Sequence, residues 1–362
     1  MKRIFALPSQ RAHKMFALTF AAVLLLCSCT PKNPDPINTD PEDQPAWEKL
    51  EFSKGADISW ATEMESKGQK FYDFSGQERE CTALFKSIGF NSVRFRVWVN
   101  PTERWSGRED VLEKAKRAQA LGMKIMIDFH YSDWWADPGK QNVPAAWKNH
   151  TPQEMASAVA SHTSDVLYNL KNNGIDVAWV QVGNEVTNGM LWESGRVKDQ
   201  SADNFCSYFT AGYKAVKSIY PDAAVILHID NGWNYETMRW YFDLMKSKNL
   251  VYDMIGLSLY PAYWENGGYP DWTPKVKQFV TNLDTCFARY GKPIMLCEFG
   301  MPEPLPAESK AALQYLMDNT KDKKFFKGIF LWEPESEPER NGYDQGAFLG
   351  GKPTVALDPF KN

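Results

Sequence analysis

The chain has 362 residues and a formal net charge of −4, with 43% hydrophobic and 24% charged residues. This composition supports a large buried core and excludes disorder over most of the chain. The mild acidity argues against nucleic acid as a partner, because phosphate binding needs clustered Lys and Arg. The 14 Trp, 15 Tyr and 21 Phe residues fit either a ring-shaped ligand that stacks or an aromatic-rich core.

The N-terminal segment has the pattern of an export signal. A basic stretch without acids, residues 2–14, precedes an apolar run over residues 15–26 that is too short to span a bilayer. The run ends in Leu26-Cys27-Ser28-Cys29, which resembles the lipobox of bacterial lipoproteins. We therefore expect a lipoprotein signal peptide over residues 1–28 and a lipid on Cys29, with Cys27 as the second choice. A plain cleaved signal is the alternative.

The segment after Cys29 is expected to be a tether. Residues 29–49 are rich in Pro, Asp and Asn and lack periodicity, which is typical of an extended, flexible linker before a domain over residues 50–362. Its acidic residues resemble a surface-export signal of some Gram-negative bacteria. The sequence thus predicts a monomer anchored by lipid at the cell envelope of a Gram-negative bacterium, at the outer membrane or the cell surface.

Four cysteines fall within the predicted domain, at positions 81, 206, 286 and 297. They are far apart and form no CxxC pair, so neither a zinc site nor a dense disulfide framework is indicated. We expect buried thiols, although one disulfide is possible in an oxidising compartment.

Eight short apolar runs alternate with amphipathic stretches from residue 50 onward. Nearly continuous β-formers are typical of parallel strands covered on both faces, and the repeated alternation predicts a single-domain α/β protein, a (β/α)8 TIM barrel. A doubly wound sheet is less favoured, because no glycine-rich turn follows the first strand. The expected strands are residues 55–58, 92–98, 124–129, 178–183, 224–228, 254–259, 294–297 and 328–331, and the expected helices include residues 108–121, 152–172, 202–219, 274–290 and 307–319.

Polar and aromatic residues follow most of these strands, at the end where a barrel places its active site. Glu185 and Glu298 each come directly after a buried apolar run, where an unpaired charge is costly. A salt bridge to an arginine at a strand end could explain either residue alone. Together they fit retaining glycoside hydrolysis, in which an acid and a nucleophile lie about 5–5.5 Å apart.

The motifs around these strand ends resemble glycoside hydrolase family 53, the arabinogalactan endo-β-1,4-galactanases of clan A. The resemblance covers roughly residues 55–360. Its most specific motif, residues 128–141, reads Asp-Phe-His-Tyr-Ser-Asp-Trp-Trp-Ala-Asp-Pro-Gly-Lys-Gln, and shorter matches lie at residues 55–59, 93–101, 182–185, 227–233, 256–261 and 331–334. The resemblance implies a barrel that cleaves internal β-1,4-galactosidic bonds of (arabino)galactan, in pectin side chains, with retention of configuration and without a cofactor.

The resemblance also implies roles for single residues. Glu185 would be the general acid/base and Glu298 the nucleophile, which Tyr260 would hold and Arg94 would keep ionised. Arg96 could share that task, and Asn184 would bind the sugar 2-hydroxyl. His130 and His228 would bind the sugar or orient the acid. The further substrate-binding candidates are Asp133, Trp135, Asp230, Trp264 and Trp332, with Trp134 and Trp233 as additional sugar platforms.

Two other functions are alternatives to this interpretation. Another clan A endo-glycanase, a mannanase or a xylanase, would share the strand-end glutamates. A non-catalytic glycan-binding surface lipoprotein would be expected to lack one of them.

The loop at residues 301–308 is short and proline-rich, without the Asp-Gly pattern of the calcium loop in bacterial relatives. Calcium is therefore not expected there, although Glu303 and Glu308 leave a different oxygen site open.

Overall fold

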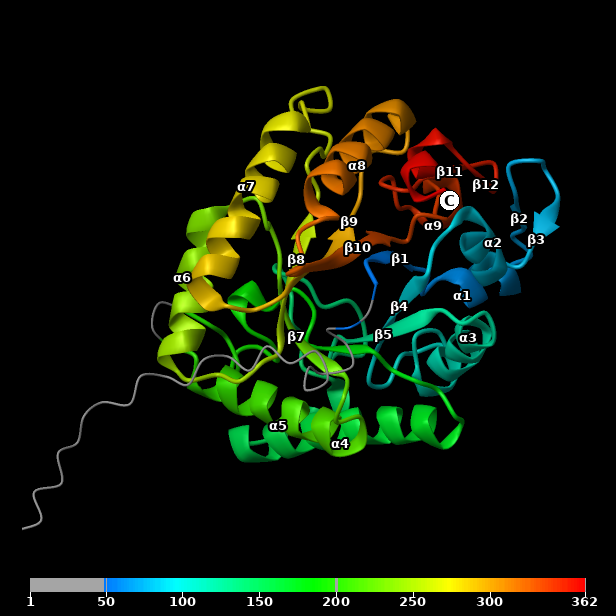
Figure 1. Ribbon diagram of the computed structural model, residues 1–362. Coiled ribbons are helices and arrows are strands. Elements are labelled where there is room, and N and C mark those ends of the chain that lie inside the picture. Colours follow the sequence, from blue (N-terminus) through cyan, green and yellow to red (C-terminus); the bar gives the residue numbers. More distant parts are fainter. Residues whose placement is uncertain (1–48, 50, 199–200, 362) are drawn as a thin grey trace, which may run out of the picture. The chain divides into compact units, whose positions relative to one another are not determined.

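The computed structural model describes residues 49, 51–198 and 201–361. The predicted signal peptide, the lipidation site Cys29 and nearly all of the tether lie outside these residues. In the described part, eight parallel strands close into a barrel in the order β1-β10-β9-β8-β7-β6-β5-β4 (Figure 1). Pairing of β1 with both β4 and β10 closes the ring. This confirms the predicted (β/α)8 barrel.

The barrel strands coincide with the predicted apolar runs. Every strand end lies within two residues of the predicted position. The largest change that bears on function is at the seventh barrel strand, which continues to Phe299 because this residue pairs with Leu259 and Leu331 on the neighbouring strands. The strands are β1 (Ser53–Asp57), β4 (Ser92–Val97), β5 (Lys124–Phe129), β6 (Trp179–Val182), β7 (Ala224–Ile229), β8 (Met254–Leu259), β9 (Ile294–Phe299) and β10 (Phe326–Trp332).

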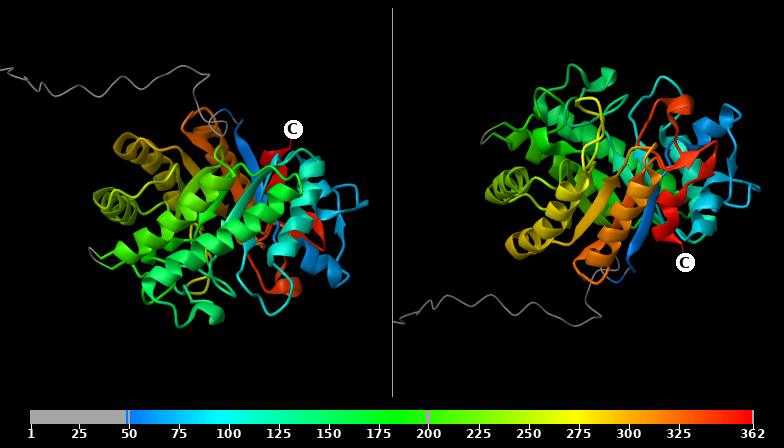
Figure 2. Two further views of the ribbon diagram at one scale, coloured as in Figure 1. Left: turned by 90° about the horizontal axis from the view of Figure 1, so that it is seen from below. Right: turned by 90° about the horizontal axis from the view of Figure 1, so that it is seen from above.

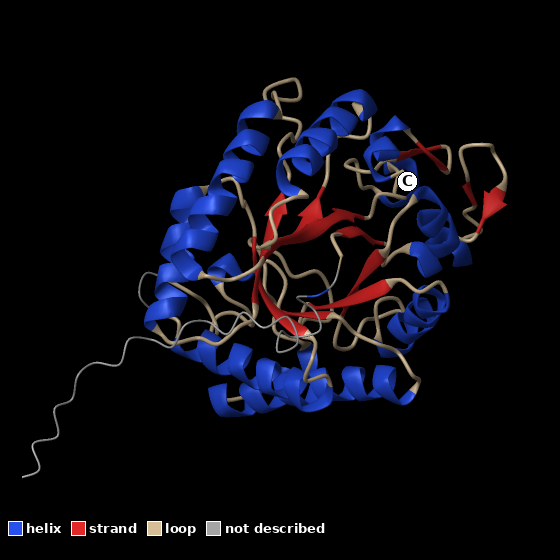
Figure 3. Cartoon of the chain, viewed as in Figure 1, coloured by secondary structure: helices blue, strands red, loops and turns tan. Residues whose placement is uncertain are grey.

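The helices surround the strands, as Figure 3 shows. The longest helix, α4, begins with a capping box in which Thr151 and Glu154 exchange hydrogen bonds. It packs beside the next helix, α5 (Figure 2). The helices are α1 (Ala61–Ser66), α2 (Cys81–Ile88), α3 (Arg108–Ala120), α4 (Pro152–Asn172), α5 (Asp203–Ile219), α6 (Tyr235–Ser247), α7 (Thr273–Tyr290), α8 (Pro306–Thr320) and α9 (Pro338–Asn341). Two small antiparallel pairs are β2 (Phe71–Tyr72) with β3 (Glu78–Arg79) and β11 (Phe348–Leu349) with β12 (Lys352–Pro353).

The interior of the barrel is packed by large side chains. Met126, Trp179, Met254 and Phe330 belong to one buried cluster inside the ring of strands, and a second, larger core lies between strands and helices. A barrel interior filled in this way is a core rather than a pore. Binding and chemistry are therefore left to the rim, where the strands end.

The four cysteines of the domain are free thiols. Those at positions 81, 286 and 297 are buried, as predicted, whereas Cys206 is only partly buried. No helix in the described part of the chain is both long and apolar enough to cross a bilayer.

Candidate active site

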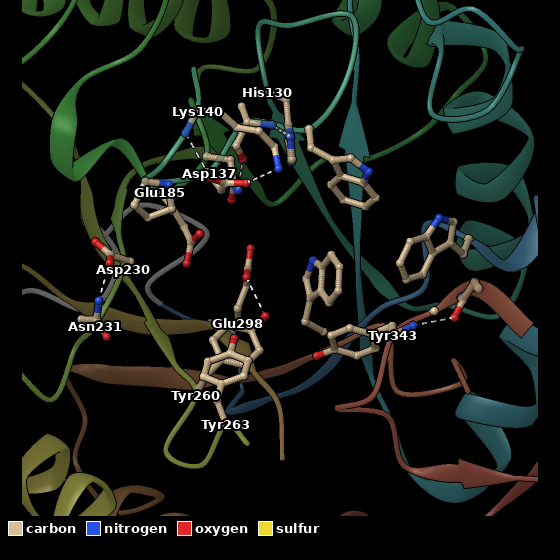
Figure 4. Close-up of a pocket in the computed structure, with 18 residues that line it drawn as sticks. His130, Asp137, Lys140, Glu185, Asp230, Asn231, Tyr260, Tyr263, Glu298 and Tyr343 are labelled. Carbon is tan, nitrogen blue, oxygen red and sulfur yellow. Dashed lines mark hydrogen bonds and ion pairs between the residues drawn. The ribbon is translucent and has the colours of Figure 1, made fainter. Parts of the chain in front are cut away.

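A cavity of about 590 Å³ opens at the carboxyl ends of the barrel strands. Figure 4 shows the side chains that line it. Eight of them are residues that the sequence predicts for the site: His130, Trp135, Asn184, Glu185, Asp230, Tyr260, Glu298 and Trp332. The others are Trp60, Ala136, Asp137, Pro138, Lys140, Asn231, Tyr263, Asn341, Gly342 and Tyr343.

Glu298 lies near the end of β9 and is 4% exposed. Its Oε1 accepts a hydrogen bond from Arg94 Nη2 at 2.8 Å, and its Oε2 accepts one from Tyr260 Oη at 2.8 Å. Both contacts favour the carboxylate, as predicted. Burial outweighs them and raises the pKa of Glu298 to about 7. Arg94 thus lowers this pKa only relative to what burial alone would give.

Glu185 follows β6 in the left-handed backbone conformation, with φ of 45°. The turn depends on Gly183, which has φ of 93° and whose added Cβ would lie 2.6 Å from Val186 Cγ1. The Glu185 carboxyl points across the cavity toward Glu298 (Figure 4). Burial, and then the charges of Glu298 and Asp230, raise the pKa of Glu185 well above its usual range. Of the two carboxyls, Glu185 therefore holds the proton more tightly.

Arg94 is the centre of a buried network below the cavity. It is fully buried on β4, where it forms ion pairs with Asp57 at 2.6 Å, Asp128 at 2.9 Å and Glu298 at 2.8 Å. Its Nε donates to Gln181 Oε1 at 2.6 Å, and its Nη2 donates to Asn184 Oδ1 at 2.9 Å. One guanidinium thereby positions the nucleophile candidate and its neighbours.

The two predicted histidines, His130 and His228, differ in their access to the cavity. His130 lines the cavity, with Nε2 2.9 Å from Asp128 Oδ2, and its Nδ1 accepts from Ala136 N at 3.0 Å. His228 is completely buried, and burial holds its pKa well below the usual range. It therefore does not reach the cavity as a substrate-binding residue, which corrects that prediction.

The position of His228 fits the other predicted role, orientation of the acid. Its Nε2 lies 2.8 Å from Ser258 Oγ, and Ser258 is hydrogen-bonded to the Glu185 carboxyl. Its Nδ1 lies 2.6 Å from Gln181 Nε2. Because the Gln181 amide donates to Nδ1, the remaining proton of a neutral ring sits on Nε2 and points to Ser258.

Three further expectations are corrected by the structure. Asp133 does not line the cavity, because its two oxygens accept from the backbone N–H groups of Asn100 at 2.9 Å and Ala145 at 2.8 Å. Trp264 is 60% exposed and lines a separate hollow of about 460 Å³. Arg96 forms its ion pair with Glu333 and not with Glu298.

One side of the cavity is formed by aromatic rings. The Trp332 ring lies 5.4 Å from that of Trp60, 5.6 Å from that of Trp135 and 4.6 Å from that of Tyr343, measured between ring centroids. We call Trp60, Trp135, Trp332 and Tyr343 the aromatic wall. Of the predicted additional platforms, Trp134 lies outside the cavity with its ring tilted against that of Trp98, and Trp233 lies against Lys275.

The sequence did not predict several of the residues that line the cavity. Trp60 stands three residues after β1 and could have been found as a strand-end aromatic. Asp137 and Lys140, which form an ion pair at 2.8 Å, lie within the longest family motif. Tyr263 and Tyr343 come from loops in which no periodic pattern marks the path of the chain.

The described residues contain no group of three or more His, Cys, Asp or Glu side chains arranged to hold a metal ion. In the loop at residues 301–308, Glu303 contributes its backbone N–H to Asp344 O at 2.8 Å.

Comparisons with known proteins identify the family of the chain. The model of glycosyl hydrolase family 53 matches residues 53–326. A probable arabinogalactan endo-β-1,4-galactanase A of Neosartorya fischeri is 32% identical, over 78% of this chain and 83% of that protein. The endo-β-1,4-galactanase of Bacillus subtilis is 30% identical, over 78% of this chain and 70% of that protein. A solved structure of a fungal β-1,4-galactanase superposes with a TM-score of 0.76 at 27% identity, covering 84% of this chain and 98% of that one.

A closed (β/α)8 barrel with two glutamates facing each other at the carboxyl ends of its strands defines a glycoside hydrolase. The match over residues 53–326 makes the assignment specific: the chain belongs to glycosyl hydrolase family 53.

Proposed function

We propose that this protein is a retaining endo-β-1,4-galactanase that cleaves internal bonds of galactan and arabinogalactan in pectin side chains. One observation carries the proposal: two buried glutamates face each other in one cavity, and their surroundings assign them different protonation states. The galactanases among its relatives supply the choice of sugar.

In the first step, the Glu298 carboxylate attacks the anomeric carbon while Glu185 gives its proton to the departing glycosidic oxygen. Arg94 and Tyr260 hold the attacking carboxylate, one at each of its two oxygens. The products are a galactosyl ester on Glu298 and a shortened glycan with a free hydroxyl. Glu185 is left as a carboxylate.

In the second step, Glu185 takes a proton from water, whose oxygen attacks the same carbon and releases Glu298. Two inversions give net retention. Asn184 lies beside both glutamates, where its amide is fixed by Arg94 and by Ala136 O, which accepts from Nδ2 at 2.8 Å. We assign it the sugar 2-hydroxyl. The aromatic wall offers ring faces to the apolar face of galactose.

The test is incubation of the purified domain with linear β-1,4-galactan, β-mannan and xylan. We expect new reducing ends from galactan alone, a rapid fall in viscosity that reports internal cleavage, and a first product in the β configuration by proton NMR. Cleavage of mannan or xylan in place of galactan would favour the other clan A activities. Tight galactan binding without cleavage would favour the glycan-binding lipoprotein.

We further propose that the protein is a monomer anchored by a lipid on Cys29 at the outer membrane or cell surface of a Gram-negative bacterium. The support is the basic and apolar pattern before Leu26-Cys27-Ser28-Cys29 and the acidic, proline-rich segment after it. Metabolic labelling with a fatty acid in a Gram-negative host should mark the wild-type protein and the Cys27→Ala variant. It should not mark Cys29→Ala, which should leave the membrane fraction. Equal labelling of Cys29→Ala would refute the assignment.

A further inference from the structure

Two glutamates behind the aromatic wall have no role in the proposed reaction. Glu333 directly follows Trp332 at the end of β10, and Glu335 lies two residues later. Both side chains are completely buried, and neither lines the cavity. Glu333 has φ of 44°, a conformation that a residue other than glycine adopts only at a cost. Strain of this kind persists only where surrounding contacts hold the residue in place.

Glu333 holds the Trp60 side of the wall at two points. Its Oε1 forms an ion pair with Arg96, and its Oε2 accepts a hydrogen bond from the backbone N–H of Trp60 at 3.1 Å. The Arg96 guanidinium lies 4.9 Å from the Trp60 ring centroid and 4.3 Å from that of Trp135. A cation held over an aromatic face attracts it. The ion pair therefore fixes two of the wall's rings from behind.

No other residue in the described part of the chain donates a hydrogen bond to the Glu335 carboxyl. Its only side-chain hydrogen bond is with the Glu333 carboxyl. An ionised carboxylate only accepts hydrogen bonds, so a bond between two carboxyls needs a proton on one of them. Because Glu333 already accepts from Arg96 and Trp60, the proton belongs on Glu335. Glu335 is thus a neutral acid that donates to Glu333.

The charges around the pair support this placement. Burial, followed by the neighbouring charge of Glu333 and that of Asp57, raises the pKa of Glu335 well above its usual range. The titratable and charged groups facing the pair are Arg96, Asp57 on β1, Tyr343, and Cys81 on α2, whose thiol pKa is itself raised by burial and by Glu335. Arg96 is the one cation among them. If Glu335 lost its proton, the single positive charge of Arg96 could not balance the carboxylates of Asp57, Glu333 and Glu335.

We propose that Glu335 is a positioning residue: as a neutral hydrogen-bond donor it keeps Glu333 paired with Arg96, and so keeps Trp60 and Trp135 in place to bind the sugar. Arg96 and Glu333 form an ion pair with each other, whereas Glu298 pairs with Arg94. The pair should therefore act on substrate binding more than on the chemical step. The sugar-binding part of this inference rests on the proposed function, whereas the packing of the wall does not.

The experiment compares Glu335→Gln, which keeps a neutral N–H donor, with Glu335→Leu, which has none. Glu337→Gln is the matched control, because Glu337 lies on the same loop but pairs with Arg340 and the Gly351 N–H. Near-ultraviolet circular dichroism reports the coupled tryptophan rings, and steady-state kinetics on galactan separates KM from kcat. We expect Glu335→Leu to change the tryptophan signal and to raise KM about tenfold with a smaller change in kcat. Glu335→Gln should restore both, and Glu337→Gln should change neither.

A pH titration gives a second readout. Wild-type protein should change its tryptophan signal and KM together at alkaline pH, where Glu335 ionises, and Glu335→Gln should not, because an amide has no such proton. Identical alkaline transitions in the two proteins would overturn the inference, as would a loss of kcat alone in Glu335→Leu. If galactan is not cleaved at all, the proposed function fails, but the tryptophan signal still tests the pair. Should Glu335→Leu fail to fold, the comparison of wild type with Glu335→Gln decides the question.

Discussion

At the scale of single residues, the surroundings of Glu298 oppose one another. Arg94 and Tyr260 favour its carboxylate, while burial disfavours it and brings its pKa to about 7. Glu185 lacks a directly bonded cation and has a higher pKa. In the proposed reaction, the working form of the enzyme has Glu298 charged and Glu185 protonated. We therefore expect a bell-shaped dependence of kcat/KM on pH, whose acid limb reports mainly Glu298 and whose alkaline limb reports mainly Glu185.

Tyr260→Phe tests this balance. Removal of the hydroxyl that donates to Glu298 Oε2 at 2.8 Å destabilises the carboxylate, so the pKa of Glu298 rises and the acid limb moves to higher pH. At pH 6 we expect kcat/KM to fall about tenfold, with a smaller loss near the optimum. The measurement is the pH profile of galactan cleavage. An acid limb in the same place as in wild type would contradict the assigned role of Tyr260.

Substitution of either glutamate by the isosteric amide removes its function. For Glu185→Gln we expect kcat to fall by about 10²–10⁴-fold, because no proton reaches the leaving group, and for Glu298→Gln at least as much. Both variants should retain the urea midpoint of wild type, since buried neutral amides replace carboxyls that burial disfavours when charged. Near-normal turnover by either variant would refute the pair.

The sequence predicted those site residues that stand at strand ends, because the barrel brings every strand end to one rim. Glu185, Glu298, Tyr260 and Trp332 are examples of such residues. Loop residues were harder to place. Asp133 is in the longest family motif but serves backbone N–H groups, a common use of a loop aspartate that sequence cannot separate from ligand binding.

At the scale of elements, the strands were predicted well because strands buried on both faces are near-continuous apolar runs. The register between them depends on details that such runs do not show. In the barrel interior, Gly55 on β1 faces the Phe330 ring of the paired strand β10, and a Cβ at position 55 would lie 2.3 Å from Phe330 Cδ1. The glycine thus makes room for the large ring of the neighbouring strand.

Gly55→Ala should therefore be costly. Phe330 is completely buried and has no free space to move into, so we expect a loss of about 1–3 kcal/mol in the free energy of unfolding. Urea denaturation measures it. The control is Gly268→Ala, where no atom lies within 4 Å of the added Cβ and the change should be near zero. Equal stability of the two variants would contradict the close packing of β1 against β10.

At the scale of the whole molecule, acid stability should depend on one histidine outside the active site. The His162 ring lies among those of Phe129, Tyr131 and Trp147, and its Nε2 has no partner among the described residues. Burial lowers its pKa from 6.5 to about 4. The unfolded chain therefore binds a proton at a higher pH than the folded one does.

The sign follows from this difference. Stability contributed by neutral His162 is complete above about pH 6.5 and is lost as the pH falls toward about 4. Because His162 is only partly buried, we expect the loss to be about 2 kcal/mol. His162→Gln cannot be protonated, so the difference in unfolding free energy between the two proteins should change by this amount across the window. A constant difference would show that His162 titrates alike in the folded and unfolded chains.

The contacts of Arg94 limit which residues the enzyme can accept at this position. Its fork of N–H groups serves partners on β1, β5, β6 and β9 as well as Asn184, two residues after β6, and lysine offers a single point of charge in place of that fork. A library randomised at this codon and selected for growth on galactan should return arginine alone. Attempts to redirect the enzyme to another polysaccharide should leave that position untouched and diversify the loops carrying Tyr263 and Tyr343.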